Sequence, residues 1–121
     1  MASDNEHCGD RGRECTITVS NPVLRGMYPD PSWIWDTTRE EIVLVNSSFE
    51  LVPGLPIHTT RDLVTWTRTA NAVDETMSHR LLIDGVEDSG GLYAPTIRRI
   101  GGRYVIVCTV ARVDEVKALA A

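Results

Sequence analysis

Residues 28–46 read YPDPSWIWDTTREEIVLVN and combine a carboxylate held between prolines with two strand-like runs. Ser32 to Trp35 is short and rich in aromatic and β-branched residues, and the polar stretch 36–40 that follows is typical of a turn. Glu41 to Asn46 is almost continuously apolar, which indicates a partner strand buried on both faces. This stretch therefore predicts two neighbouring strands joined by a turn.

Asp30 lies between Pro29 and Pro31 at the start of this stretch. Each proline restricts its own φ, and Pro31 also disfavours the helical region for the residue before it. We therefore expect Asp30 in a β or polyproline conformation, with little freedom to turn away. A fixed carboxylate next to an aromatic side chain suits a general base, whereas the pentapeptide alone also fits an ordinary surface acid in a turn.

Strand signals continue on the C-terminal side. Pro56 to Thr60 and Val64 to Arg68 are predicted as short strands, with Asp62 as a turn or cap residue between them. The polar stretch 74–91 predicts a long loop. Beyond it, Gly101 and Gly102 separate two strand-like runs, Thr96 to Ile100 and Arg103 to Val110, as expected for a β-hairpin with a two-residue turn. The chain is thus predicted to be all-β.

Composition limits the classes of partner. The 121 residues include 12 basic and 17 acidic side chains, and the net charge of −5 disfavours nucleic acid and anionic membranes. No apolar run approaches the ~20 residues that span a bilayer. The N-terminus has no apolar signal region, which favours a cytoplasmic chain over a secreted one. The three cysteines, Cys8, Cys15 and Cys108, lack metal-ligand spacing, so we expect reduced thiols, no metal and no cofactor.

Three segments carry a family resemblance: NPVLRGMYPDPSWIW at 21–35, NSSFELVPGLPIHTTRDLVTW at 46–66 and SGGLYAPTIRRIGGRYVIVCT at 89–109. Together they resemble the N-terminal part of glycoside hydrolase family 43, in particular its β-xylosidase and α-L-arabinofuranosidase members. The resemblance implies a five-bladed β-propeller with the substrate in its central funnel. It also implies an inverting hydrolysis that uses carboxylates from different blades.

The resemblance divides the chain into three parts. Residues 1–20 are a polar N-terminal extension, residues 21–110 are the N-terminal blades, and residues 111–121 are a helix-prone tail that departs from the family pattern. At about 45 residues per blade, the chain supplies about two to three blades, whereas a closed propeller needs at least four. We therefore expect a partial propeller, with open blade edges that allow self-association.

The resemblance implies that Asp30 is the general base, because the YPDPS motif carries that residue in the family. Inverting glycosidases also need a general acid, with the two carboxyl groups roughly 6.5–9.5 Å apart. The family's acid and its modulating aspartate lie beyond the matched segments, and neither motif is found here. Glu50 is interpreted as a solvated acid and Asp88 as a loop acid.

Phe49 and Tyr93 are the candidate substrate-binding residues. Aromatic faces stack on sugar rings, and the resemblance places an aromatic residue at the pocket where Tyr93 stands. Phe49 fits either the pocket or the core at a strand end. The other conspicuous aromatics are interpreted as structural: Trp33 and Trp35 alternate on one face of a strand and predict packing between blades, as does Trp66. His58 is interpreted as a core or surface residue.

These observations predict an inverting glycosidase acting on xylan-derived β-xylosides or arabinofuranosides, with an oligosaccharide substrate. The chain would be an N-terminal fragment that is inactive alone. Two alternatives remain open from the sequence. One is a non-catalytic carbohydrate-binding or interaction module, and the other is a truncated product without a folded function.

Overall fold

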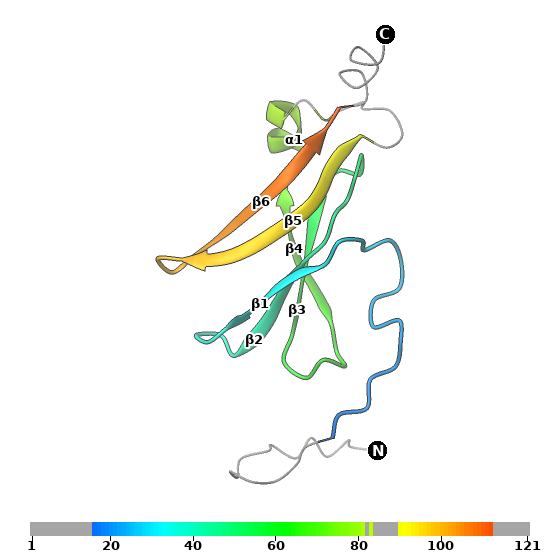
Figure 1. Cartoon of the computed structure of the whole chain (residues 1–121), viewed down its shortest axis with the longest axis vertical. Helices are drawn as coiled ribbons and strands as arrows, with labels where there is room; N and C mark the ends of the chain where they lie inside the picture. The colour runs from blue at the N-terminus through cyan, green and yellow to red at the C-terminus, as the bar shows by residue number, and fades with distance from the viewer. Residues whose placement is uncertain (1–15, 82, 84–89, 113–121) are drawn as a thin grey trace.

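The computed structural model describes residues 16–81, 83 and 90–112, and within them six strands form two antiparallel sheets (Figure 1). The first sheet has the order β1-β2-β3-β4, and the second is the hairpin β5-β6. A short helix, α1, follows β4. The bounds are β1 Ser32–Asp36, β2 Glu41–Val45, β3 Gly54–Thr60, β4 Thr67–Val73, α1 Glu75–Leu81, β5 Gly91–Ile100 and β6 Arg103–Ala111. The all-β prediction is confirmed at this level, since the helix is only seven residues long.

Strands β1 and β2 confirm the predicted pair. Their register places Ser32 opposite Val45 and Asp36 opposite Glu41. Strand β2 is buried on both faces, because Val43 and Val45 join the core while Leu44, on the opposite face, is only 7% exposed. This two-sided burial explains the continuous apolar run, since neither face of β2 is left to water.

The hairpin of β5 and β6 is also confirmed. Gly101 and Gly102 form its turn with φ values of +55° and +77°. Two consecutive positive φ values are what a two-residue hairpin turn needs to match the twist of its strands, and glycine adopts them without steric cost. No heavy atom approaches within 4 Å of a Cβ added at either position, so the glycines serve conformation rather than close packing.

The core lies between the two sheets, where β5 crosses the first sheet (Figure 1). Leu92 and Ile97 of β5 are fully buried, and they belong to one apolar cluster with Val43, Val45 and Leu55 of the first sheet. Burial of each such side chain contributes about 1.5–3 kcal/mol to folding relative to leaving it exposed. Packing against β5 therefore fixes the hairpin on one face of the four-stranded sheet.

Strand β4 begins three residues later than predicted, at Thr67 rather than Val64. The cause is Asp62, whose Oδ1 accepts hydrogen bonds from the backbone N–H groups of Val64 and Thr65 at 2.9 and 2.7 Å. These bonds close a loop in which Leu63 has a φ of +63°. Its predicted role as a turn residue is confirmed, and the same backbone bonds, led by that from Thr65, lower the pKa of Asp62 to about 2.

The stretch 74–91 is not only a loop, because α1 occupies its first part. Asp74 caps this helix, with its Oδ1 accepting from the backbone N–H of Met77 at 2.8 Å. Seven residues are too few to display a helical apolar period, which is why the pattern did not predict a helix. Asp88 lies outside the described residues, as do most of the N-terminal extension and most of the tail at 111–121.

Asp36 joins the two sheets in a way that the sequence did not predict. Its buried carboxylate accepts from the backbone N–H groups of Thr38 and Arg39, from the guanidinium of Arg99 at 2.8 Å, and from the hydroxyl of Tyr104. The hydrogen bond from Tyr104 leads the effects that hold the pKa of Asp36 below its ordinary value, against the opposing effect of burial. Because β5 and β6 carry Arg99 and Tyr104, this acid fastens the hairpin to the β1–β2 turn.

The face of the first sheet that points away from the hairpin carries exposed aromatic residues. Trp33 and Trp35 share this face as predicted, but they are 60% and 50% exposed rather than packed. His58, on the same face, is buried beneath Tyr28, and the two rings meet edge-on with their centroids 4.8 Å apart.

Trp66 is half-buried and donates its indole N–H to the Leu63 carbonyl within the loop between β3 and β4. In the described part of the chain, no helix has the length and apolar character to cross a membrane.

Candidate functional site

Asp30 lies just before β1 and has a φ of +50°, so the predicted extended conformation is wrong. Hydrogen bonds, rather than the prolines, account for its position. The amide of Asn46 donates to the carbonyls of Tyr28 and Pro29 at 2.8 and 3.2 Å, and the backbone N–H of Ser47 donates to Pro29 at 3.0 Å. Aspartate tolerates a left-handed backbone better than most residues. The carboxylate is therefore fixed, but by the end of β2.

The Asp30 side chain is tied to β5 through one serine. The hydroxyl of Ser47 donates to Oδ2 of Asp30 at 2.6 Å, and the Oγ of Ser47 accepts from the backbone N–H of Ala94 at 2.8 Å. Ser47 is completely buried, whereas Asp30 is exposed. The carboxylate thus faces solvent while a buried group holds one of its oxygens.

The two predicted aromatic residues are brought together. The rings of Phe49 and Tyr93 stack with centroids 4.4 Å apart and planes inclined by 25°. Both side chains are half-buried. An isolated bridge supports the pair, in which Phe49 and Leu92 exchange backbone hydrogen bonds of 2.9 and 3.1 Å. A Cβ added at Gly91 would overlap the carbonyl oxygen of Phe49, so only glycine permits this approach.

Three residues of this region have left-handed backbones. Asp30, Phe49 and Ala94 have φ values of +50°, +53° and +46°. This conformation costs a non-glycine residue roughly 1–2 kcal/mol, and such strain gathers at functional sites because the surroundings must enforce it. Glu40, Leu55 and Leu63 also have positive φ values, so this conformation is not confined to the candidate site. At the site it accompanies the hydrogen bonds made by Asn46 and Ser47.

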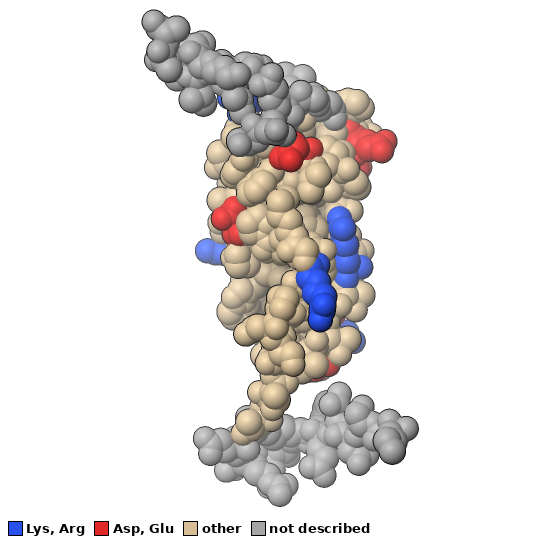
Figure 2. Space-filling view, turned by 90° about the vertical axis from the view of Figure 1, so that its right-hand side faces the viewer, with Lys and Arg blue, Asp and Glu red and all other residues tan. Residues whose placement is uncertain are grey.

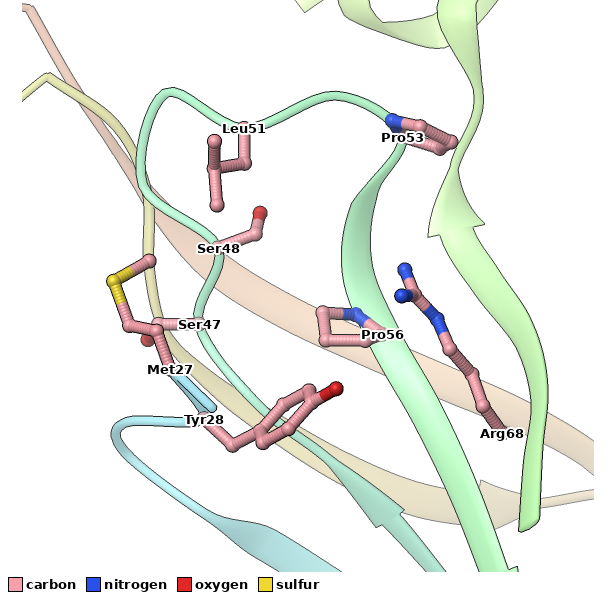
Figure 3. A pocket seen from close by; sticks show the side chains of 8 residues that line it. All are labelled: Met27, Tyr28, Ser47, Ser48, Leu51, Pro53, Pro56 and Arg68. Carbon is pink, nitrogen blue, oxygen red and sulfur yellow. The ribbon is translucent and has the colours of Figure 1, made fainter. Parts of the chain in front are cut away.

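A cavity of about 210 Å³ adjoins the site and includes Ser47 in its wall (Figure 3). Its lining combines apolar and polar side chains: Met27, Tyr28, Ser47, Ser48, Leu51, Pro53, Pro56 and Arg68. The Tyr28 ring lies beside Pro56, and the guanidinium of Arg68 extends toward Pro53 (Figure 3). Most of these residues are apolar or aromatic, and Ser47, Ser48 and Arg68 add polar groups, as in small-molecule pockets generally.

Charge does not dominate the face of the molecule shown in Figure 2. Most of the face in Figure 2 carries neither acidic nor basic side chains, and the charged ones are scattered over it. Among the described residues, no group of three or more histidine, cysteine or acidic side chains is placed to hold a metal ion. Glu50 follows Phe49 and is exposed, in keeping with its interpretation as a solvated acid.

Sequence reasoning missed Ser47, Asn46 and Ala94 as site residues. The available signal was a run of small polar residues, Asn46 to Ser48, at the end of a buried strand. Buried polar groups must find partners, so such a run predicts hydrogen bonds to neighbouring segments. Which segments these would be depends on contacts 17 and 47 residues away in the chain.

Comparison with known proteins gives a consistent result. A family model described as glycosyl hydrolases family 43 matches residues 19–119. A xylan 1,3-β-xylosidase from a Vibrio species is 33% identical over 89 residues, which is 74% of this chain and 16% of that protein. A non-reducing end α-L-arabinofuranosidase from Bacteroides ovatus is 38% identical over 93 residues, 76% of this chain and 17% of that protein.

Solved structures agree with this result. The crystal structure of a xylan β-1,4-xylosidase from Bacillus halodurans superposes with a TM-score of 0.67 and 30% identity, covering 77% of this chain and 17% of that one. The chain thus spans about a sixth of the length of the relatives that it matches. The resemblance predicted from the three sequence segments is confirmed, and the chain belongs to glycosyl hydrolase family 43.

Proposed function

We propose that this chain supplies one part of the substrate site of an inverting glycosidase that acts on β-xylosides or α-L-arabinofuranosides. The observation that carries the proposal is the link between the exposed carboxylate of Asp30 and the segment that presents the stacked rings of Phe49 and Tyr93. The names of the relatives, which are xylosidases and arabinofuranosidases, support the substrate class.

In this proposal, Asp30 accepts a proton from the water that attacks the anomeric carbon. The sugar at the reacting position is held against the aromatic pair, whose faces match the apolar face of a sugar ring. A general acid must protonate the leaving oxygen from the other side of the bond, at roughly 6.5–9.5 Å from the base. We propose that this acid comes from outside the chain described here, since its motif is not found in the sequence.

We propose that the chain forms part of a five-bladed β-propeller. The sheet β1–β4 would be one blade, and the hairpin β5–β6 would begin the next, within the unit predicted at 21–110. Strand β1 is an edge strand of its sheet, and Trp33 and Trp35 leave its outer face apolar. Exposed edges and apolar faces favour pairing with further protein, so we propose that the chain alone self-associates there.

The test is hydrolysis of 4-nitrophenyl β-D-xylopyranoside and 4-nitrophenyl α-L-arabinofuranoside by the 121-residue chain and its Asp30→Ala variant. We expect no turnover from a folded sample, because loss of a proton-transfer partner costs about 10²–10⁴-fold and positioning is also incomplete. Turnover that Asp30→Ala abolishes would mean that the chain also supplies the acid. Turnover that survives Asp30→Ala would exclude Asp30 as the base.

A non-catalytic carbohydrate-binding module is the second candidate, and the stacked aromatic pair favours it. Such a module needs the rings of Phe49 and Tyr93 but not a base. The two functions separate in a parent enzyme that contains this segment, where Asp30→Asn should abolish turnover under the first proposal. Under the second, no substitution at Asp30 should change any measured activity.

A further inference from the structure

Ser47 stands between the Asp30 carboxylate and the backbone beside Tyr93. Its hydroxyl oxygen is 2.6 Å from Oδ2 of Asp30 and 2.8 Å from the backbone nitrogen of Ala94. The side chain has no exposure to solvent. The serine is therefore shielded from bulk solvent, whereas the carboxylate that accepts its proton is exposed.

The direction of the two hydrogen bonds is fixed by chemistry. The backbone N–H of Ala94 can only donate, so the serine oxygen accepts from it. A serine hydroxyl has a single proton, and an ionised carboxylate can only accept. The proton of Ser47 is therefore committed to Oδ2 of Asp30, and the three groups form a directed chain from amide to hydroxyl to carboxylate.

We infer that Ser47 is the positioning residue of the catalytic carboxylate and that it couples Asp30 to the Ala94 amide. The inference rests on the proposed function for its catalytic meaning. A hydrogen bond from a neutral hydroxyl to a carboxylate is about twice as strong as one between neutral groups. It occupies Oδ2, whereas no described residue donates a hydrogen bond to Oδ1. Oδ1 is therefore the oxygen left to take a proton from water.

The hydrogen bonds of Ser47 also set the position of Asp30 relative to the stacked rings of Phe49 and Tyr93. Ala94 directly follows Tyr93 and has a φ of +46°, and Phe49 lies two residues after Ser47. The backbone bonds between Phe49 and Leu92 complete the connection. Asp30 and the aromatic pair thus belong to one hydrogen-bonded unit, so a sugar resting on the rings is held at a fixed place relative to Oδ1.

The experiment measures the chemical shift of the Ala94 backbone amide by NMR in the isotope-labelled 121-residue chain. It compares single and double variants at Asp30 and Ser47. Asp30→Asn removes the negative charge, and the coupling carries this change through Ser47 to the Ala94 amide. We expect Asp30→Asn to shift that resonance clearly in the wild-type background. In the Ser47→Ala background, the shift caused by Asp30→Asn should be lost.

Ser48→Ala is the matched control. Ser48 is also a buried serine, but its hydroxyl accepts from the backbone N–H of Leu55 at 3.0 Å and has no contact with Asp30 among the hydrogen bonds of the described residues. The shift of the Ala94 resonance caused by Asp30→Asn should therefore persist in the Ser48→Ala background. It should also be present in the Ser47→Thr background, because threonine keeps the hydroxyl. An undiminished response in Ser47→Ala, or its loss in Ser48→Ala, would overturn the inference.

A measurement on the wild-type chain tests the inference if Ser47→Ala fails to fold. The Ser47 hydroxyl proton should exchange slowly with water and lie close to the Ala94 amide proton; a rapidly exchanging hydroxyl would contradict the coupling. Sugar binding is measured separately on the same samples. Coupling without sugar binding would refute the proposed function alone, and sugar binding without coupling would refute the inference alone.

Discussion

Asp30 and Asp36 lie six residues apart and have opposite surroundings. Asp36 is 1% exposed and accepts hydrogen bonds from two side chains and two backbone groups. Asp30 is exposed and accepts one, from Ser47. A carboxylate whose lone pairs are fully used is poorly placed to take a proton from water, so Asp36 is suited to a structural role, whereas the surroundings of Asp30 leave it free for the catalytic role that we propose.

At this scale the sequence indicated which residues to examine but not how they are held. The YPDPS motif pointed to Asp30, yet the prolines do not give it an extended backbone, because the end of β2 holds the preceding carbonyls. The roles of Ser47 and of Arg99 depend on partners 17 to 63 residues away. No local pattern encodes such contacts.

Asp36 and Asp62 should make the fold sensitive to acid. Both carboxyl groups have a lowered pKa in the folded chain, so the unfolded chain binds protons more readily. Their stabilisation is complete above the ordinary pKa near 3.8 and is lost as the pH falls, for Asp62 down to about 2. We expect the melting temperature to fall between about pH 5 and pH 2.

The substitution Asp36→Asn tests which acid matters more. It should lower the melting temperature at pH 7, and the difference from the wild type should shrink as the pH falls below the ordinary pKa of 3.8 and the wild-type carboxylate becomes protonated. Asp62→Asn is the control and should lower the melting temperature less, because Asp62 closes an exposed loop rather than joining two sheets. Equal melting temperatures for Asp36→Asn and the wild type at pH 7 would contradict the role assigned to Asp36.

Among the elements, the strand pair and the hairpin were predictable and the other boundaries were not. β1, β2 and the β5–β6 turn follow from apolar runs and from two glycines, which are local signals. The start of β4 and the presence of α1 depend on the capping side chains of Asp62 and Asp74. Aspartate occurs both in turns and at helix caps, so its presence alone could not separate a loop from a short helix.

The start of β5 offers a test at the level of the element. Gly91→Ala should disrupt the bridge between β5 and Phe49, because the new Cβ would overlap a backbone carbonyl. Gly101→Ala is the matched control, with a positive φ but open space around it, and should cost about 1–2 kcal/mol. We expect Gly91→Ala to be clearly more destabilising in chemical denaturation. Equal losses would show that Gly91 is needed only for its φ.

For the whole molecule, the family could be read from the sequence, whereas the arrangement of the two sheets could not. Asp36, Arg99 and Tyr104 meet across 63 to 68 residues of chain. The pairing of Phe49 with Tyr93 likewise requires β5 to cross the end of β2. Sequence alternation placed Trp33 and Trp35 on one face, but only the structure shows that this face is exposed.

Exposure of this face leads to an expectation about assembly. The chain should sediment as a mixture of monomer and larger species, because β1 offers both an open edge and two exposed tryptophans. Trp33→Lys with Trp35→Lys should move the population toward monomer. Val64→Lys, which removes an apolar side chain that is 54% exposed on the loop between β3 and β4, should leave sedimentation unchanged. A monomeric wild-type chain would contradict this expectation.

The most direct test of the proposed sugar site is a titration of the labelled chain with xylobiose and with arabinose, followed through backbone amide resonances. We expect saturable shifts at Ser47, Phe49, Tyr93 and Ala94, retained in Asp30→Asn and lost in Phe49→Ala. The absence of saturable shifts in a folded sample, or shifts confined to the side of the cavity lined by Tyr28 and Arg68, would contradict the account.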